Sequence, residues 1–300
     1  RGGGYLFHCK QAEQKVGGMM RKKHRNLRRT AVGGVKQLYM ILISIFMLFP
    51  LLWGLLTSLK PQDEIFTYPP KIFGSLTLEN YQWVFEKQNL GMSILVTLGL
   101  AACSTVLGVL FATFAAYIFS RYSFTGKGFF MSFVVCPMLI PGLVNLIPLF
   151  SVYTKLGMVD KFWGLVLLYL PSVMPFAVMV LLNYLHSVPF TLEEAAMIDG
   201  CSRFQLLTKI ILPVIVPGVV AVSMISFVTI WNEFIITLIF TTGGNVRTLT
   251  MTMYYLVGKN SVNYGAVCAA AFISLVPVLI IFIIFRKQFI NSMIDGAIKG

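Results

Sequence analysis

The chain has 300 residues, of which 57% are hydrophobic and only 12% are charged. Soluble domains carry roughly a quarter charged residues, so this composition excludes an ordinary soluble protein. Membrane-spanning segments must satisfy their backbone hydrogen bonds internally, and the alternating segments of roughly ten residues that build a barrel are absent. We therefore expect an all-α polytopic membrane protein.

The first 36 residues are polar and hold ten of the 24 lysines and arginines. No nucleic-acid-binding motif accompanies them, so we interpret residues 1–36 as a basic cytoplasmic arm that sets membrane orientation, with no nucleic-acid partner. Met19 or Met20 directly precedes the densest basic run, and we expect the natural start there, with Arg1–Gly18 upstream or disordered. The next apolar run is too long for a signal-peptide core and should remain as an anchor.

Six long apolar runs follow, and Glu233 is their one internal charge. Each is long enough for the ~20 residues that a transmembrane helix needs. With the basic arm inside, the loops place seventeen Lys and Arg inside and seven outside, in agreement with the positive-inside rule. We therefore predict that both termini are cytoplasmic, with a transmembrane domain over 37–285 and a cytoplasmic tail over 286–300. The expected helices cover residues 37–59, 92–118, 128–153, 163–185, 211–240 and 264–285.

Spans three to five carry polar and helix-breaking residues. Each holds a proline pair, and broken helices often mark the pathway in transporters, although proline is also tolerated in membrane helices. Along the fifth span, polar side chains recur at steps of three and four and would share one face of a continuous helix. Such a stripe should face a water-filled path or a neighbouring helix rather than lipid. The pathway candidates are Asn145, Ser226, Thr229, Asn232 and Glu233.

The segment Pro189–Pro213 is the longest polar-rich interruption in the C-terminal two thirds of the chain. Thr191 and Glu194 have the spacing of a capping box, which predicts a short helix over Leu192–Asp199. Gly200 can adopt the left-handed conformation that ends such a helix. We therefore expect a surface helix followed by a sharp turn.

A second helix is expected directly after this turn. Ser202 and Gln205 have the spacing of another capping box, and the helix should continue into the membrane through Lys209. The small side chains of Ala195 and Ala196 would let the backbone of another protein approach the first helix closely. A capped surface hairpin without a partner is the simpler alternative.

Glu194-Ala195-Ala196, Gly200 and Ile210-x-Leu212-Pro213 occur at the spacing of the EAA loop, so the chain resembles the permease subunits of ABC importers. The resemblance implies a type I ABC-importer permease fold with six transmembrane helices. It also implies that the first helix of the hairpin is a coupling helix that docks into a groove on a cytoplasmic ATPase. The residues to which the resemblance assigns a role in ATPase coupling are Glu194, Ala195, Ala196, Asp199, Gly200, Ile210, Leu212 and Pro213.

Less specific motifs resemble those of the maltose-type, carbohydrate-uptake branch of these permeases. The stretch Trp231-Asn232-Glu233-Phe234 is similar to one in its fifth span, and Leu156–Phe176 to its connection between the third and fourth spans. The segment Lys60–Leu90 is similar to its first outer loop, and an ordered cap without a ligand role is an equal alternative. The outer loop 243–247 departs from the branch because it has no aromatic residue. The C-terminal tail resembles one that reaches the ATPase pair, which implies contacts at Gly296, Lys299 and Gly300.

The resemblance thus implies a carbohydrate permease in the cytoplasmic membrane of a prokaryote. Its expected partners are a second, distinct permease chain, two cytoplasmic ABC ATPase subunits, an extracytoplasmic sugar-binding protein and membrane lipid. The sequence contains no P-loop and no Cys/His ligand spacing, so we expect no catalytic residue, metal or cofactor in this chain, and ATP hydrolysis by a partner. The alternatives are another cargo (amino acid, peptide, phosphate or metal), an ATP-independent secondary transporter or channel, and a membrane scaffold without cargo.

Overall fold

The computed structural model describes residues 34, 36–69, 71, 74–140, 142–242, 244–257 and 262–298, the last ten of these without their side chains. Nearly all of the expected basic arm, as well as Lys299 and Gly300, lies outside the described residues. The chain divides into two compact units, residues 1–57 and 58–300, which are described separately.

The first unit contributes one apolar helix, which spans Lys36–Ser58 up to the unit boundary. Its 23 residues correspond to about 35 Å of helix, enough to cross a bilayer core of about 30 Å. The hydroxyls of Ser44 and Thr57 donate to the carbonyl oxygens four residues earlier, at 2.8 and 2.9 Å. These local bonds satisfy polar side chains that would otherwise face an apolar environment.

In its described residues, the second unit is built from helices and their connections, and its one β-bridge joins Val257 to Val262. Because helices satisfy their own backbone groups, this confirms the all-α expectation. In chain order the elements are α2 (Gln62–Ile65), α3 (Glu79–Gln88), α4 (Leu90–Arg121), α5 (Lys127–Val135), the 3-10 turn η1 (Cys136–Met138), α6 (Gly142–Lys155), α7 (Phe162–His186), α8 (Phe190–Ile198), α9 (Arg203–Gln205), the π-helical stretch η2 (Leu206–Ile211), α10 (Leu212–Trp231), α11 (Ile235–Phe240), α12 (Leu249–Leu256) and α13 (Tyr264–Ile298).

Five helices of the described chain are long and apolar enough to cross a membrane, and a sixth span results if the α5–α6 pair is counted as one. That pair bends by 100°, so the expected continuous helix over 128–153 is wrong. The break follows η1, which has Pro137 in its first turn. Proline cannot donate a backbone hydrogen bond, and its ring disfavours a helical conformation in the residue before it.

The fifth span also differs from the expectation. It runs from Arg203 to Trp231 through α9, η2 and α10, and residues 235–240 form the separate helix α11. The expected bounds 211–240 are therefore wrong at both ends, because the span begins earlier in the chain and stops before Glu233. Consequently, the polar residues from Ser223 to Thr237 do not form one stripe along a single helix.

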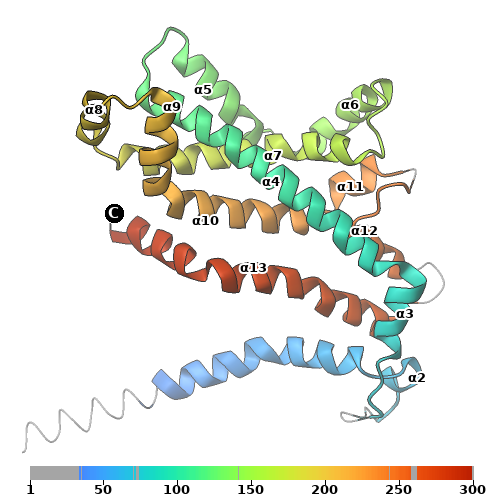
Figure 1. Cartoon of the computed structure of the whole chain (residues 1–300). Helices are drawn as coiled ribbons and strands as arrows, with labels where there is room; N and C mark the ends of the chain where they lie inside the picture. The colour runs from blue at the N-terminus through green and yellow to red at the C-terminus, as the bar shows by residue number, and fades with distance from the viewer. Residues whose placement is uncertain are drawn as a thin grey trace, which may run out of the picture. The chain divides into compact units, whose positions relative to one another are not determined.

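The most extensive packing within the second unit joins α4 to α7, and α10 lies against both (Figure 1). A Cβ atom added at Gly108 of α4 would lie 2.7 Å from the side chain of Val173 on α7, so this close approach requires glycine. Small residues of this kind let membrane helices approach closely. The buried small residues of α4 recur at helical spacing: Ala101, Ser104, Gly108, Ala112 and Ala116.

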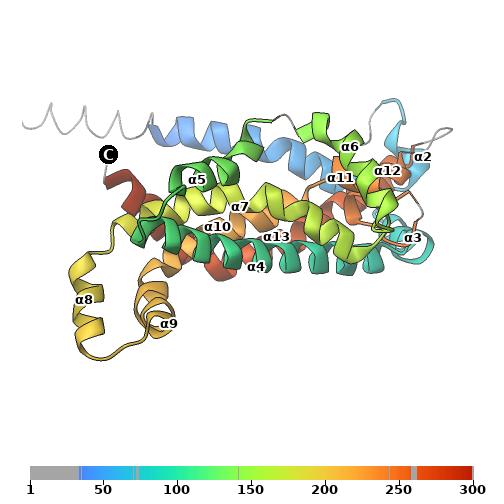
Figure 2. The same cartoon turned by 90° about the horizontal axis from the view of Figure 1, so that it is seen from above.

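The helices α8 and α9 form a hairpin that projects at one end of the second unit, here called the hairpin end (Figure 2). The C-terminal part of α13 reaches the same end (Figure 1). The short helices α2, α3, α6, α11 and α12 gather at the opposite end in both views. The long helices thus connect two ends that carry different short elements.

Candidate functional site

The α8–α9 hairpin has the turn that its sequence predicts. Gly200 adopts a φ of +86°, in the left-handed region that glycine reaches at low cost. The hydroxyl of Ser202 accepts from the backbone N–H of Gln205 at 3.3 Å, and the side chain of Gln205 accepts from the backbone N–H of Ser202 at 3.0 Å. The left-handed cap and the second capping box are confirmed.

The first capping box is wrong. Helix α8 begins at Phe190, before the expected start at Leu192, and no side-chain hydrogen bond caps it in the structure. Its N-cap is Pro189, in an extended conformation, so Thr191 lies inside the first turn. Asp199 is the C-cap, and its backbone N–H donates to the carbonyl oxygen of Ala195 at 3.0 Å.

The two faces of α8 differ in exposure. Glu193 and Ala196 point inward, and only 4% and 6% of their surfaces are exposed. Glu194 and Ala195 are exposed, and so is Ile198, at 85%. The expectation that both alanines form an open face is therefore wrong for Ala196, because Glu193 and Ala196, three residues apart, share the buried face of the helix.

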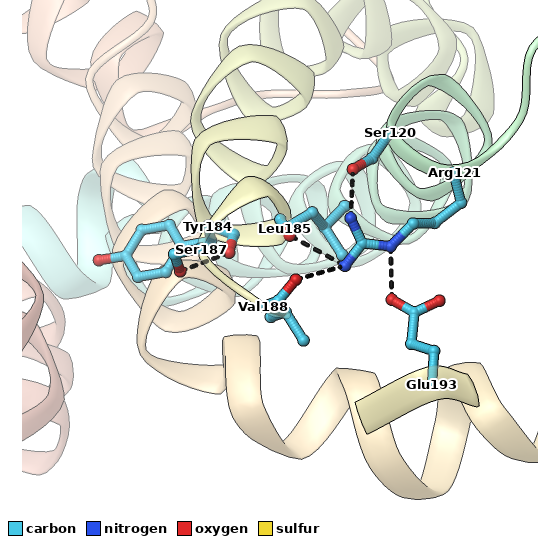
Figure 3. Close-up of polar contacts among 7 residues, drawn as sticks. All are labelled: Ser120, Arg121, Tyr184, Leu185, Ser187, Val188 and Glu193. Carbon is cyan, nitrogen blue, oxygen red and sulfur yellow. Dashed lines mark hydrogen bonds and ion pairs between the residues drawn. The ribbon is translucent and has the colours of Figure 1, made fainter. Parts of the chain in front are cut away.

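Glu193 forms a buried ion pair with Arg121, the last residue of α4 (Figure 3). The guanidinium Nε donates to the carboxylate Oε1, and only 4% and 5% of the two side chains are exposed. Paired and hydrogen-bonded charges can be buried at acceptable cost, whereas a lone buried charge is strongly unfavourable.

The remaining donors of Arg121 hold other elements (Figure 3). One terminal nitrogen donates to the carbonyl oxygens of Leu185 and Val188, at 3.0 and 3.1 Å, and the other donates to the hydroxyl of Ser120 at 3.0 Å. The Leu185 carbonyl belongs to the last turn of α7, where helix carbonyls lack intrahelical partners, and the Val188 carbonyl to the segment that connects α7 to α8. The guanidinium also lies 4.4 Å from the centre of the Phe190 ring.

Sequence reasoning missed both members of this pair. In the sequence, Arg121 is one of the seventeen charges expected inside, and Glu193 has no assigned role. They lie 72 positions apart, and each alone is an ordinary charge at the end of a helix. One signal of a shared face was present in the sequence. Glu193 and the small residue Ala196 are three positions apart, so a helix places them on the same side.

The last three expected coupling residues lie at the base of the hairpin. Ile210 lies in the π-helical stretch η2, and Leu212 and Pro213 begin α10. Ile210 and Leu212 pack against the core, whereas Pro213 is exposed. These residues connect the hairpin to the membrane helices rather than belonging to the exposed face of α8.

A second polar site surrounds Glu233, between α10 and α11. Its carboxylate accepts from the backbone N–H groups of Ile236 at 2.8 Å and Thr237 at 3.3 Å, so it caps the start of α11. The buried hydroxyl of Tyr169 on α7 donates to the same carboxylate at 3.2 Å. The hydroxyl of Thr250 donates to the backbone carbonyl of Glu233 at 2.8 Å. This carboxylate explains why the fifth span divides here.

Two of the five pathway candidates meet at one cavity. Asn145 and Glu233 line a cavity of about 460 Å³ between α6, α7 and α11, together with Ser172 and Tyr153. Polar groups placed in a mostly apolar cavity are typical of small-molecule sites.

The other three pathway candidates do not line this cavity. Ser226 is buried in α10. Thr229 and Asn232 are exposed, and their side chains donate to carbonyl oxygens four residues earlier, at 2.8 and 2.9 Å. Of the expected tail contacts, Gly296 lies in the last turns of α13, and Lys299 and Gly300 lie outside the described residues.

Residues 104–289 match the model of a protein family described as the binding-protein-dependent transport system inner membrane component. Two curated relatives match nearly the whole chain. A sulfoquinovosyl glycerol transport system permease protein of Agrobacterium fabrum is 32% identical and covers 84% of this chain and 89% of its own length. A trehalose/maltose transport system permease protein of Thermococcus litoralis is 33% identical and covers 87% of this chain and 94% of its own length.

Solved structures share the fold. A chain of a bacterial ABC transporter that imports the acidic polysaccharide alginate has a TM-score of 0.76 at 19% identity, covering 86% of this chain and 96% of that chain. A methionine ABC transporter chain has a TM-score of 0.52 at 16% identity, and the match covers 71% of this chain and 98% of that chain. The arrangement of helices described above is therefore one that transporter chains adopt.

Proposed function

Because the chain belongs to the family of inner-membrane components of binding-protein-dependent transport systems, we propose that it is the permease of an ABC importer for a carbohydrate, coupled to its ATPase through the α8–α9 hairpin. The observation that carries this proposal is the projecting hairpin, whose Gly200 turn and exposed α8 face occur at the spacing of the EAA loop. A multi-pass inner-membrane protein is consistent with the five or six apolar helices.

The exposed face of α8 supports an ATPase contact. This face, here called the docking face, consists of Thr191, Glu194, Ala195 and Ile198. It combines a carboxylate, a small side chain and an isoleucine that is 85% exposed. The positive-inside distribution assigns this end of the unit, and both termini, to the cytoplasm, where ATP is available.

The proposed cargo class follows from the relatives and from the Glu233 cavity. Their names give sulfoquinovosyl glycerol and trehalose or maltose as cargo. The carboxylate of Glu233, the amide of Asn145 and the hydroxyl of Ser172 could exchange hydrogen bonds with sugar hydroxyls at the cavity wall. We assign to Glu233 and Asn145 a role in the pathway, and to Ser226, Thr229 and Asn232 a role in the structure of α10.

The proposed partners are those of an importer of this type. The alginate importer has been solved in complex with a periplasmic protein that carries an alginate pentasaccharide. By analogy, this chain would pair with a second permease chain, two ATPase subunits and an extracytoplasmic sugar-binding protein.

Affinity purification of the full chain from its native membrane, followed by reconstitution of the complex into vesicles, tests the function. We expect a P-loop ATPase and a second permease to co-purify, and labelled sugar to enter the vesicles only with ATP and the binding protein. Absence of an ATPase after gentle crosslinking would contradict the permease proposal. ATP-dependent uptake of amino acids or phosphate, without any sugar, would contradict only the cargo class.

A further inference from the structure

Arg121 joins the ends of three helices at the hairpin end (Figure 3). It ends α4, donates to one carbonyl oxygen in the last turn of α7 and one in the segment that follows, and pairs with Glu193 in the first turn of α8. The covalent connection from α7 to α8 is only the segment 187–189, and it carries one of the carbonyls that Arg121 binds. A single side chain therefore fixes both a helix end and the orientation of the helix that follows.

We propose that Arg121 is a positioning residue for transport, which makes α8 move as one body with the ends of α4 and α7. This inference rests on the proposed docking of α8 on an ATPase. In addition to that docking, a displacement of α8 would be transmitted through Arg121 to the α4–α7 pair. Arg121 would act as a mechanical connection between these helices, without contact to cargo or nucleotide.

Three properties suit arginine to this role. The described contacts use four of its five N–H donors, directed from a rigid plane toward four acceptors. Burial excludes the water that would otherwise compete for these bonds. Phe190, the first residue of α8, lies against the flat side of the guanidinium. Lysine would keep the charge, but it offers three donors from one atom and cannot reproduce this geometry.

The α4–α7 pair links Arg121 to the cavity that contains Glu233. α4 and α7 have the most extensive mutual packing, with the close approach at Gly108 and Val173. α7 also supplies Ser172 to the cavity that contains Glu233. Closely packed helices transmit displacement because their interior has little room to deform. Movement of α8 would therefore reach one wall of the cavity through α7.

The first test measures the distance between spin labels on α4 and α8 in the full complex. Labels would be attached at Phe114→Cys on α4 and Leu192→Cys on α8, both exposed positions outside the docking face, after the native cysteines are replaced by serine. With Arg121 present we expect one narrow distance distribution that is the same with and without ATP. With Arg121→Lys we expect a broader distribution. A wild-type distance that changes on ATP binding, or an unchanged narrow distribution in Arg121→Lys, would overturn the proposal.

The second test measures transport per ATP hydrolysed. Arg121→Lys and the milder Glu193→Gln should each lower it by about two- to thirtyfold, the range over which changes in a coupling network act. Arg286→Lys on α13 and Glu86→Gln on α3 make the same chemical changes at exposed positions and should leave it unchanged. An unchanged ratio in both Arg121→Lys and Glu193→Gln would contradict the positioning role, even if either variant were less abundant in the membrane.

The two tests also separate this inference from the function on which it rests. If no ATPase associates with the wild-type complex, the proposed function fails, although the distance measurement can still show whether α8 is fixed to α4. If the ATPase associates and uptake is normal in Arg121→Lys, the function stands and only the positioning role fails.

Discussion

At the scale of single residues, the hairpin depends on a few side chains whose roles differ sharply between neighbours. Glu193 and Glu194 are adjacent, yet one is buried against Arg121 and the other is exposed. Ala195 and Ala196 show the same division. This alternation arises because α8 lies with one face on the unit, and successive helical residues point about 100° apart.

The buried ion pair predicts an asymmetric response to mutation. Glu193→Ala should lower the free energy of unfolding by about 3–5 kcal/mol, because it leaves the Arg121 charge buried without its partner. Glu194→Ala, at an exposed position, should change it by less than about 0.5 kcal/mol. Thermal unfolding of the purified protein in detergent measures the difference. Equal effects of the two substitutions would show that Glu193 is not buried as described.

Substitution of Gly200 by a branched residue should reduce coupling between ATP hydrolysis and transport without reducing the amount of protein in the membrane. Gly200→Val should cost about 1–2 kcal/mol, since a left-handed φ is unfavourable for a residue with a branched Cβ, whereas Gly200→Asn should be tolerated better. A Cβ atom at this position meets no atom within 4 Å, so the effect is one of backbone conformation. Membrane levels of both variants should match the wild type, while uptake falls in Gly200→Val. Normal uptake by that variant would contradict the coupling role of the turn.

At the scale of elements, the divided fifth span is the least expected feature. A charge-poor apolar run predicts one helix, but Glu233 provides a carboxylate that caps α11 and receives the hydroxyl of Tyr169. The helix is therefore interrupted at the residue that carries the one charge inside an expected span. The same carboxylate lines the cavity, so the break in the helix and the candidate pathway share one side chain.

The capping role of Glu233 is testable separately from transport. Glu233→Ala should destabilise the first turn of α11 by about 0.5–2 kcal/mol, the usual value of a helix cap. Hydrogen exchange at the backbone amides of Ile236 and Thr237 should then become faster. Asn232→Ala is the matched control, because that side chain is exposed and bonds only within its own helix. Equal exchange rates in both variants would contradict the capping role.

Local sequence signals predicted part of the local structure of this chain, although the first capping box and the continuity of the third and fifth spans were wrong. Apolar runs located the helices, and Gly200, Ser202 and Gln205 predicted the turn and the second cap of the hairpin. Contacts that depend on how distant helices meet were not predictable from such signals. The pair of Arg121 and Glu193 depends on where the end of α4 lies relative to the end of α7. The inward face of Ala196 depends on the same packing.

At the scale of the whole molecule, an exposed helix lies at one end of the second unit, and a mostly apolar cavity with a few polar groups lies between α6, α7 and α11. The docking face would receive the motion of an ATPase, Arg121 would pass it to α4 and α7, and α7 would move one wall of the cavity. The family match and the shared fold support a transporter of this kind. We propose that the hairpin is the part of this chain through which transport is coupled to ATP.

The most direct test of that claim is a cysteine-crosslinking scan of α8 against the co-purified ATPase in native membranes. Single cysteines at residues 191, 193, 194, 195, 196 and 198, in a background without other cysteines, would be treated with a short crosslinker. We predict crosslinking from the docking-face positions 191, 194, 195 and 198, and little from the buried positions 193 and 196. Equal yields at all six positions, or no crosslink to an ATPase at any of them, would contradict the account.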